Sequence, residues 1–433
     1  MKRFLMDELV EWKNRTRRKP LLLNGARQVG KTWLLKEFGS IHFDNVAYIS
    51  LDNDPVARSY FDADFNVRRI ISSLSLELDI DIDPDKTLIV LDEIQACPKA
   101  ITSLKYFCEN APEYAVVAAG SLLGVSATEG TGFPVGKVNM LDLYPLSFPE
   151  FLYATGNGRF AELIESGDAD MMEPFSGKLE NLLKQYYVVG GMPDAVNAFI
   201  ESEDFQAARE IQHEILDGYT RDFAKHIPPR LLARTMLVWE SIPKHLSKEN
   251  KRFIFGHVRK GARATDFEES ISWLEQAGLI DKVRRVSKPG IPLSAYAEQN
   301  SFKVFLVDIG LLSAMCGLDP ASILKGNQVF TEFKGSLTEQ YVCQELIASR
   351  GLAPFYWSAE NSSGEIDFVA QIDGTVYPIE VKAEENLRAK SLRAFKSSYP
   401  QTECVRFSIS GYREQDWMKN VPLYAISSTK LWG

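Results

Sequence analysis

Near the start of the chain stands the octapeptide Gly25-Ala26-Arg27-Gln28-Val29-Gly30-Lys31-Thr32, which fits the pattern G-x-x-x-x-G-K-[ST]. Its glycines allow a tight loop whose backbone N–H groups and following helix N-terminus face phosphate groups. In this pattern the lysine reaches the β- and γ-phosphates, and the Thr32 hydroxyl ligates Mg²⁺. An apolar strand over 21–24 and a helix from Lys31 to about Phe38 flank the loop. The sequence therefore predicts that all eight residues contact a nucleoside triphosphate, with ATP and Mg²⁺ as the expected ligands.

A second apolar strand, over 88–91, ends in two carboxylates, Asp92 and Glu93. We expect Asp92 to hold the Mg²⁺ shell and Glu93 to polarise the attacking water. Such a strand end is often only solvated, but downstream of a phosphate-binding loop it indicates a catalytic site. The prediction of hydrolysis, beyond nucleotide binding, depends mainly on Glu93.

Short apolar segments alternate with helical ones in the first part of the chain, at residues 21–24, 46–51, 88–91 and 115–119. Strands that are apolar throughout and alternate with helices are typical of a parallel sheet covered on both faces. We therefore expect residues 1–150 to form an α/β domain with a parallel sheet.

The rest of the chain has a different pattern. We interpret residues 151–230 as a helical lid or linker. Residues 231–300 contain helices, then a strand over 280–286 and a turn at Pro289-Gly290, the order of a winged helix-turn-helix. Residues 301–433 return to alternating helices and strands, which predicts a separate α/β domain.

A basic patch surrounds the predicted recognition helix and wing. It consists of Arg259, Lys260, Arg263, Lys282, Arg284, Arg285 and Lys288. Such a patch would contact nucleic-acid phosphates without reading sequence. The alternative, of equal weight, is a solvated face of a packing domain, because acidic residues nearby lower the net charge.

A hairpin is predicted in the last domain. The segment 365–371 alternates as a strand should, Asp373-Gly374 is a strong two-residue turn, and 376–382 returns antiparallel. Side chains two residues apart share a face of a strand, so Glu380 and Lys382 point the same way.

Asp367 lies on the first strand of this hairpin, at a plausible position facing Glu380. Two carboxylates beside Lys382 make a divalent-metal site that can activate water against a phosphodiester. Glu339 joins the candidates because it lies on the apolar face of a predicted helix, an unusual place for an acid. The alternative is an exposed ion pair between Glu380 and Lys382, with Glu339 at a packing edge.

Composition limits the class of protein. The chain has 433 residues and a net charge of -9, so two to four domains are expected and a generally basic nucleic-acid binder is excluded. Its five cysteines form no CxxC pair, which favours reduced thiols, and its five histidines show no metal-ligand spacing. We expect no signal peptide, no membrane span and a cytoplasmic location.

Residues 18–195 or so resemble the AAA+ ATPases, in particular a bacterial and archaeal branch whose Walker B motif reads D-E-I-Q. This chain has Asp92-Glu93-Ile94-Gln95, and further matches are the octapeptide itself, Gly120-Ser121, the segment 143–148 and the segment 190–193. The resemblance implies that Ser121 is the sensor for the γ-phosphate.

One position departs from this branch. The family has Gly-Arg where this chain has Gly136-Lys137, and lysine cannot make the bidentate phosphate contact of arginine. We therefore assign no arginine finger. A homo-oligomer is compatible with the resemblance, but a ring that needs such a finger is not predicted.

The last domain resembles the PD-(D/E)XK nuclease fold, whose core is helix, strand, hairpin, helix, strand. The resemblance implies catalytic roles for Glu339, Asp367, Glu380 and Lys382, with Asp367 and Glu380 as metal ligands. The primary hypothesis is an ATPase coupled to a nuclease-like domain that can act on DNA. The alternative is a nucleotide-controlled switch that binds protein partners and has an inactive nuclease-like domain. A third hypothesis is a signalling NTPase with very slow hydrolysis.

Overall fold

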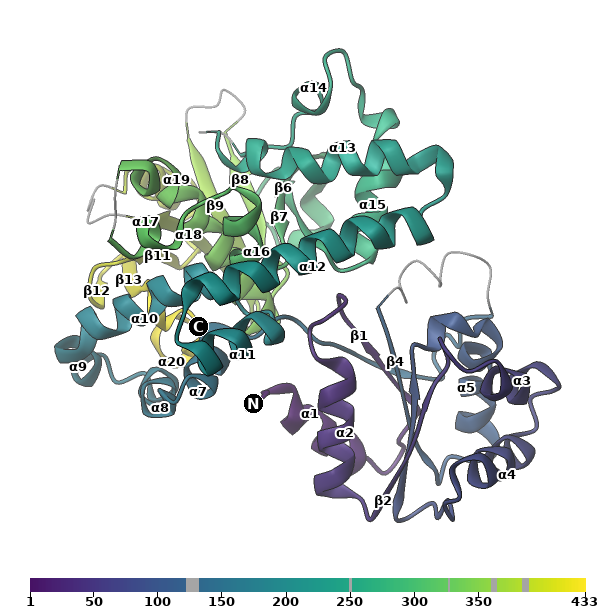
Figure 1. The fold of residues 1–433 in the computed structure, drawn as a ribbon. Helices are drawn as coiled ribbons and strands as arrows, with labels where there is room; N and C mark the ends of the chain where they lie inside the picture. The colour runs from purple at the N-terminus through teal and green to yellow at the C-terminus, as the bar shows by residue number, and fades with distance from the viewer. Residues whose placement is uncertain (122–131, 249–250, 326–327, 360–363, 384–388) are drawn as a thin grey trace. The chain divides into compact units, whose positions relative to one another are not determined.

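Figure 1 shows the fold of the chain in a computed structural model. The structure describes residues 1–121, 132–248, 251–325, 328–359, 364–383 and 389–433. It divides into two compact units. The first contains Arg3–Tyr144 and Gln276–Leu279, and the second contains Met1–Lys2, Pro145–Glu275 and Ile280–Gly433.

The first unit is built on a five-stranded sheet with the order β2-β3-β4-β1-β5, in which every pair is parallel. Its strands are β1 (Leu21–Asn24), β2 (Asn45–Ser50), β3 (Thr87–Asp92), β4 (Ala115–Gly120) and β5 (Asn139–Asp142). The predicted parallel sheet is thus confirmed. The edge strand β5 was not expected, because its short and partly exposed segment has no apolar run.

Helices cover both faces of this sheet, as the uniformly buried strands β3 and β4 require. Figure 1 shows α1 (Leu5–Lys13) and α2 (Lys31–His42) on one face. The other face carries α3 (Pro55–Asp62), α4 (Val67–Leu78) and α5 (Pro98–Asn110). Alternate strand residues such as Ile89 and Leu91 pack there with Phe61, Ile70 and Phe107.

The second unit begins with helices, as predicted for residues 151–230. In chain order its helices are α7 (Phe148–Ala154), α8 (Gly158–Ser166), α9 (Ala169–Met172), α10 (Ser176–Val189), α11 (Pro193–Ser202), α12 (Phe205–His226), α13 (Pro229–Leu246), α14 (Phe255–Val258), α15 (Glu268–Gln276), α16 (Ile309–Met315), α17 (Pro320–Lys325), α18 (Gln328–Ala348), α19 (Lys390–Ser398) and α20 (Thr429–Trp432). No helix of the described residues combines the length and apolar character needed to cross a bilayer.

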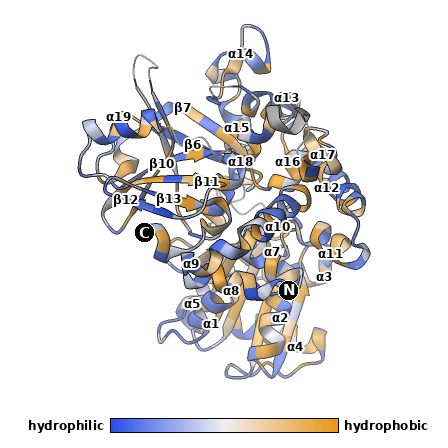
Figure 2. Ribbon diagram, turned by 90° about the vertical axis from the view of Figure 1, so that its left-hand side faces the viewer, coloured by the Kyte–Doolittle hydropathy of each residue, from blue (hydrophilic) through white to orange (hydrophobic). Residues whose placement is uncertain are grey.

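The second unit also contains an eight-stranded mixed sheet with the order β12-β13-β11-β10-β9-β8-β6-β7. The strands are β6 (Ile280–Val286), β7 (Ala297–Leu306), β8 (Phe355–Ser358), β9 (Glu365–Ile372), β10 (Thr375–Lys382), β11 (Cys404–Ser408), β12 (Arg413–Gln415) and β13 (Met418–Pro422). Figure 2 shows hydrophobic residues along β7, whereas the exposed edge strand β12 is hydrophilic.

The predicted wing is an antiparallel pair, β6 with β7, and β6 spans the residues expected of it. This pair does not stand alone, because Arg285 of β6 pairs in parallel with Tyr356 of β8 and joins the larger sheet. The predicted boundary at residue 300, between a winged helix and the last domain, falls inside β7, which spans Ala297–Leu306.

The hairpin predicted around Asp373-Gly374 is confirmed. β9 and β10 pair antiparallel from Ile372–Thr375 to Phe368–Ile379, which leaves a two-residue turn. Asp373 has φ 46° and Gly374 has φ 80°, the positive values that such a turn requires at both positions. The order α18, β8, β9–β10 hairpin, α19, β11 is the one expected from the sequence.

Helix α18 runs through the core of the second unit, where residues 336–346 are all buried. Its polar side chains bind backbone groups of other segments. Gln340 accepts from the Leu306 N–H at 2.9 Å, and Gln344 accepts from the Ile309 N–H at 2.9 Å. Glu345 accepts from the Phe148 N–H at 2.6 Å, and burial raises the pKa of Glu345 to about 8.

Replacing Glu345 with glutamine should make the stability of the second unit less sensitive to pH. A carboxyl whose pKa is raised in the folded state stabilises most below its unfolded pKa, and the gain is lost as pH rises through about 8. The wild type should lose about 1.4 kcal/mol per pH unit between the two pKa values, and the variant should not. Denaturant unfolding at several pH values measures this, with exposed Glu210→Gln as the control. Equal pH slopes for wild type and Glu345→Gln would contradict the prediction.

Candidate functional site

The octapeptide forms the loop between β1 and α2. Gly25 has φ 151° and Gly30, which precedes the first helical residue, has φ 93°. Gln28 also has a positive φ of 66°. A Cβ at Gly25 would lie 2.3 Å from the carbonyl oxygen of Leu143, so only glycine fits there. The backbone is therefore shaped by the glycines of the motif, as the sequence predicted.

Lys31 lies inside this loop with 7% of its surface exposed. Its Nζ donates to the carbonyl oxygens of Gly25 at 2.8 Å and Ala26 at 2.7 Å. Burial lowers the pKa of Lys31 to about 8, although Glu93 and Asp92 oppose the shift. A phosphate in the loop would supply the negative charge that carbonyl dipoles only partly provide.

Asp92, at the end of β3, is 3% exposed, and both oxygens of its carboxylate accept hydrogen bonds. Its Oδ2 accepts from the Thr32 hydroxyl at 2.6 Å and from the Tyr48 hydroxyl at 2.9 Å, and its Oδ1 accepts from the Glu93 N–H at 3.0 Å. Burial, followed by the charge of Asp92, raises the pKa of Tyr48. The carboxylate and the Thr32 hydroxyl present the hard oxygen atoms that Mg²⁺ prefers.

Glu93 follows directly in a left-handed conformation with φ 49° and precedes a short 3-10 helix over Ile94–Ala96. It accepts a hydrogen bond from the side-chain amide of Gln95. Ser121 follows β4 and is 1% exposed, and its hydroxyl accepts from Nε of Arg27 at 3.3 Å. Because β1, β3 and β4 are parallel, these predicted residues meet at the carboxyl edge of one sheet.

Two residues outside the motif, Tyr48 and Lys137, have contacts that the sequence does not indicate. Tyr48 was missed by the sequence analysis, because nothing local marks a strand tyrosine that reaches an aspartate on the neighbouring strand. Lys137, which stands where the resembled family has arginine, forms an ion pair with Glu109 at 2.9 Å.

The predicted metal site in the second unit has a different chemistry. Lys303 Nζ lies 3.8 Å from Oε2 of Glu339 and 2.5 Å from Oε1 of Glu365, and Lys251 Nζ lies 2.5 Å from Oε1 of Glu339. Glu339, Glu365 and Asp367, with these two lysines, are called the carboxylate cluster below. Among the described residues no group of three or more Asp, Glu, His or Cys side chains is placed to hold a metal ion.

Asp367 is included in this cluster because the charges of Glu339, Lys303 and Lys251 act on its carboxyl group. Burial raises the pKa of Asp367 to about 7, the Glu339 charge adds to the shift, and Lys303 opposes it. Its Oδ2 accepts from the Val381 N–H at 2.8 Å. Burial alone would raise the pKa of Glu339, but Lys251 and Lys303 hold it below its usual range. Burial alone would lower the pKa of Lys303, but Glu339, Glu365 and Asp367 raise it.

The other two predicted residues pair with each other. Lys382 Nζ lies 3.0 Å from Oε1 of Glu380, and the Glu380 side chain is 7% exposed. Glu380 and Lys382 thus form the ion pair predicted as the alternative, but this pair is not exposed as predicted, because Glu380 is buried. The structure also shows that Glu339 is bound to lysines of other segments, which sequence spacing could not reveal.

The basic patch around β6 is partly engaged in internal contacts. Arg285 pairs with Glu298 at 2.5 Å and donates to the Ser358 hydroxyl at 2.9 Å, while Arg284 lies 3.4 Å from Glu275. Lys282 Nζ lies 4.3 Å from the ring centroid of Phe302. These contacts favour the packing interpretation for β6, whereas Arg259, Lys260 and Arg263 are exposed.

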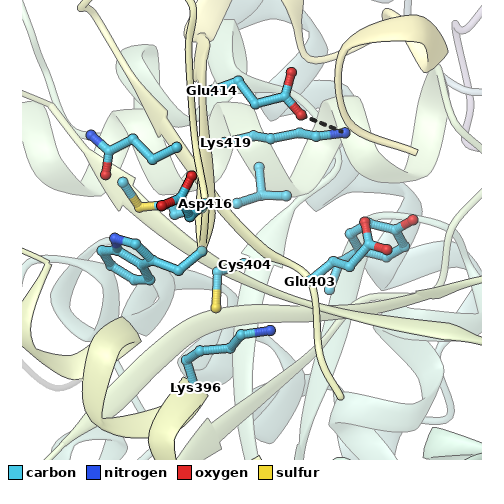
Figure 3. Close-up of a pocket in the computed structure, with 11 residues that line it drawn as sticks. Lys396, Glu403, Cys404, Glu414, Asp416 and Lys419 are labelled. Atoms are coloured by element: carbon cyan, nitrogen blue, oxygen red, sulfur yellow. Dashed lines mark ion pairs between the residues drawn. The ribbon is translucent and has the colours of Figure 1, made fainter. Parts of the chain in front are cut away.

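A cavity of about 240 Å³ lies in the second unit beside β11 and β13 (Figure 3). Its basic side chains have partners already, since Lys396 donates to the Pro400 and Thr402 carbonyls and Lys419 lies 3.9 Å from Glu414. Burial raises the pKa of the Cys404 thiol to about 11, which makes it a poor nucleophile. This cavity gives no indication of chemistry.

A parallel α/β sheet with a glycine-shaped phosphate loop, a buried lysine and a threonine–aspartate pair defines a P-loop nucleotide-binding domain. Comparison with protein families agrees. Residues 17–152 match the family model described as AAA domain, which supports a P-loop ATPase of this class. Residues 180–322 and 334–426 match two domains of unknown function, DUF8612 and DUF4143. The search of curated proteins gave no match.

Solved structures show weaker likenesses. The Walker-type ATPase PABY2304 of Pyrococcus abyssi is 14% identical, with a TM-score of 0.43 over 72% of this chain and 94% of that chain. The Orc1 protein of Aeropyrum pernix, solved in complex with DNA, is 15% identical, with a TM-score of 0.28 over 72% and 90%. Cdc6p from Pyrobaculum aerophilum is 14% identical, with a TM-score of 0.26 over 74% and 93%.

Replacing Gly25 with alanine should destabilise the first unit and weaken nucleotide binding, because the added Cβ would meet the Leu143 carbonyl oxygen at 2.3 Å. Gly136→Ala is the matched control, since Gly136 has φ 71° but nothing within 4 Å of the added atom. The control should cost about 1 kcal/mol from backbone strain, and Gly25→Ala roughly twice that or more. Unfolding midpoints and ATP titrations measure both. Equal effects of the two substitutions would contradict this account.

Proposed function

We propose that the chain binds ATP with Mg²⁺ in the loop of residues 25–32 and hydrolyses it. The observation that carries this proposal is the hydrogen bond from the Thr32 hydroxyl to Asp92, formed next to a loop that holds Lys31. Thr32 and Asp92 supply oxygen ligands for the cation, and Lys31 supplies the positive charge for the β- and γ-phosphates. The AAA domain match over residues 17–152 supports the same assignment.

In this proposal each remaining residue of the site has a defined role. Glu93 polarises the attacking water, and it directly follows Asp92, the last residue of β3. Ser121 senses the γ-phosphate, and its hydrogen bond with Arg27 connects it to the phosphate loop. The Tyr48 hydroxyl positions Asp92 by donating to the oxygen that Thr32 also contacts. Mg²⁺ supplies charge neutralisation of the phosphates when it is bound.

The role of the second unit is also a proposal. Its expected order of elements supports a nuclease-like domain, and the exposed residues Arg259, Lys260 and Arg263 leave DNA binding as a prediction. One observation favours the alternative of a nucleotide-controlled switch with an inactive nuclease-like domain. Lysine ammonium groups lie at Glu339 and at Glu380, two of the three acids that the nuclease hypothesis assigns to its catalytic site.

Lys31→Ala should weaken ATP binding by roughly 10- to 100-fold, because charged hydrogen bonds to the phosphates are lost. The fold should survive, since Lys31 Nζ donates its hydrogen bonds at Gly25 and Ala26 to carbonyls of the loop itself. Calorimetric titration of ATP measures the change, with Lys105→Ala, an exposed lysine of α5, as the charge-matched control. Unchanged ATP affinity in Lys31→Ala would refute the assignment of the loop.

Glu93→Gln should separate binding from hydrolysis. The amide keeps the shape of the side chain but cannot polarise water, so turnover should fall by about 100-fold or more while ATP remains bound. Phosphate release and nucleotide binding are measured on the same sample, with Glu113→Gln as an exposed control. If Glu93→Gln turns over like the wild type, Glu93 is not the catalytic carboxylate.

A further inference from the structure

We infer that the ammonium groups of Lys251 and Lys303 take the place of a divalent cation in the carboxylate cluster, so that the nuclease-like domain holds its acidic residues together without metal. This concerns the second unit alone. It stands or falls independently of the proposed ATPase.

Lys303 is the central group of the cluster. It projects from β7, and its side chain is 1% exposed. Its Nζ lies 2.5 Å from a Glu365 oxygen on β9 and 3.8 Å from a Glu339 oxygen on α18. One buried cation is thus shared by carboxylates from two elements, which is the arrangement that a bridging metal ion would otherwise provide.

Lys251 adds a second cation from a different segment. Its Nζ lies 2.5 Å from the other Glu339 oxygen, and its side chain is 11% exposed. Backbone pairing fixes the position of Lys251. The next residue, Arg252, pairs with Lys303 in an isolated antiparallel β-bridge, and the Phe253 N–H donates to the Phe302 carbonyl at 2.8 Å. Both oxygens of Glu339 therefore face an ammonium group.

A metal ion at this place conflicts with the two lysines. A divalent cation must lie about 2.0–2.6 Å from carboxylate oxygens, where Lys251 and Lys303 already place positive charge. The like charges would repel strongly in a buried site. Lys303 cannot turn outward to water, since it is fully enclosed. The third predicted acid, Glu380, also has a lysine as its partner, because Lys382 Nζ lies 3.0 Å from Oε1 of Glu380.

The test is Mn²⁺ binding by the full chain without nucleotide, read by calorimetry and by the shift of the unfolding midpoint. Any Mn²⁺ binding by the wild type should persist unchanged in Glu339→Gln. Any metal-dependent nicking of plasmid DNA by the wild type should likewise persist in Asp367→Asn. Stoichiometric Mn²⁺ binding lost in Glu339→Gln, or nicking lost in Asp367→Asn, would overturn the inference. The control Lys248→Met removes a nearby exposed lysine outside the cluster.

A second experiment tests whether removing the two lysines creates a Mn²⁺ site. The variant Lys251→Met with Lys303→Met leaves the carboxylates without cations, so it should be destabilised in EDTA. Millimolar Mn²⁺ should then raise its unfolding midpoint by at least about 2 °C, and adding Glu339→Gln should abolish this response. A folded double variant that ignores Mn²⁺ contradicts the inference. If the double variant does not fold, the wild-type measurements decide: Mn²⁺ binding that depends on Glu339 overturns the inference, and its absence supports it.

Discussion

The compensation of buried carboxylates by Lys303 is the interaction on which the second unit depends. The side chain connects β7, α18 and β9, because Glu339 and Glu365 come from the latter two elements. Removing one partner of such a buried ion pair typically costs about 3–5 kcal/mol, since the other charge is left without compensation. The strand pair β6–β7 therefore cannot act as a detached wing. Its lysine belongs to the core that α18 and the large sheet share.

The chain contains two buried acidic sites, and they differ in what neutralises them. Asp92 is satisfied by the hydroxyls of Thr32 and Tyr48, which are neutral and can rotate when a cation arrives. The charge of Glu339 is compensated by two ammonium groups, which compete with any cation. A hydroxyl can itself become a metal ligand, but an ammonium group has no lone pair to donate. The first arrangement suits a site that binds and releases Mg²⁺, and the second suits a permanent structural contact.

The sequence predicted those features that are local in the chain. The phosphate loop could be recognised because one octapeptide contains its glycines and polar groups, and the β9–β10 hairpin because Asp373-Gly374 specifies its turn. The pairing of β6 with β8 and the approach of Lys251 to Glu339 join residues far apart in sequence. Nothing in the residues around either partner indicates such contacts. Tyr48 escaped prediction for the same reason.

The same difference limits what the residues Asp367, Glu380 and Lys382 can predict about the chemistry of the second unit. Asp367, Glu380 and Lys382 have the expected spacing, yet spacing describes only the acids and not the cations that other segments bring to them. Lys382 is held by Glu380, and the two lysines at Glu339 come from outside the region that carries the motif. Whether an acidic cluster acts as a metal site is decided by its counter-charges. In this chain the counter-charges at Glu339 are the side chains of Lys251 and Lys303.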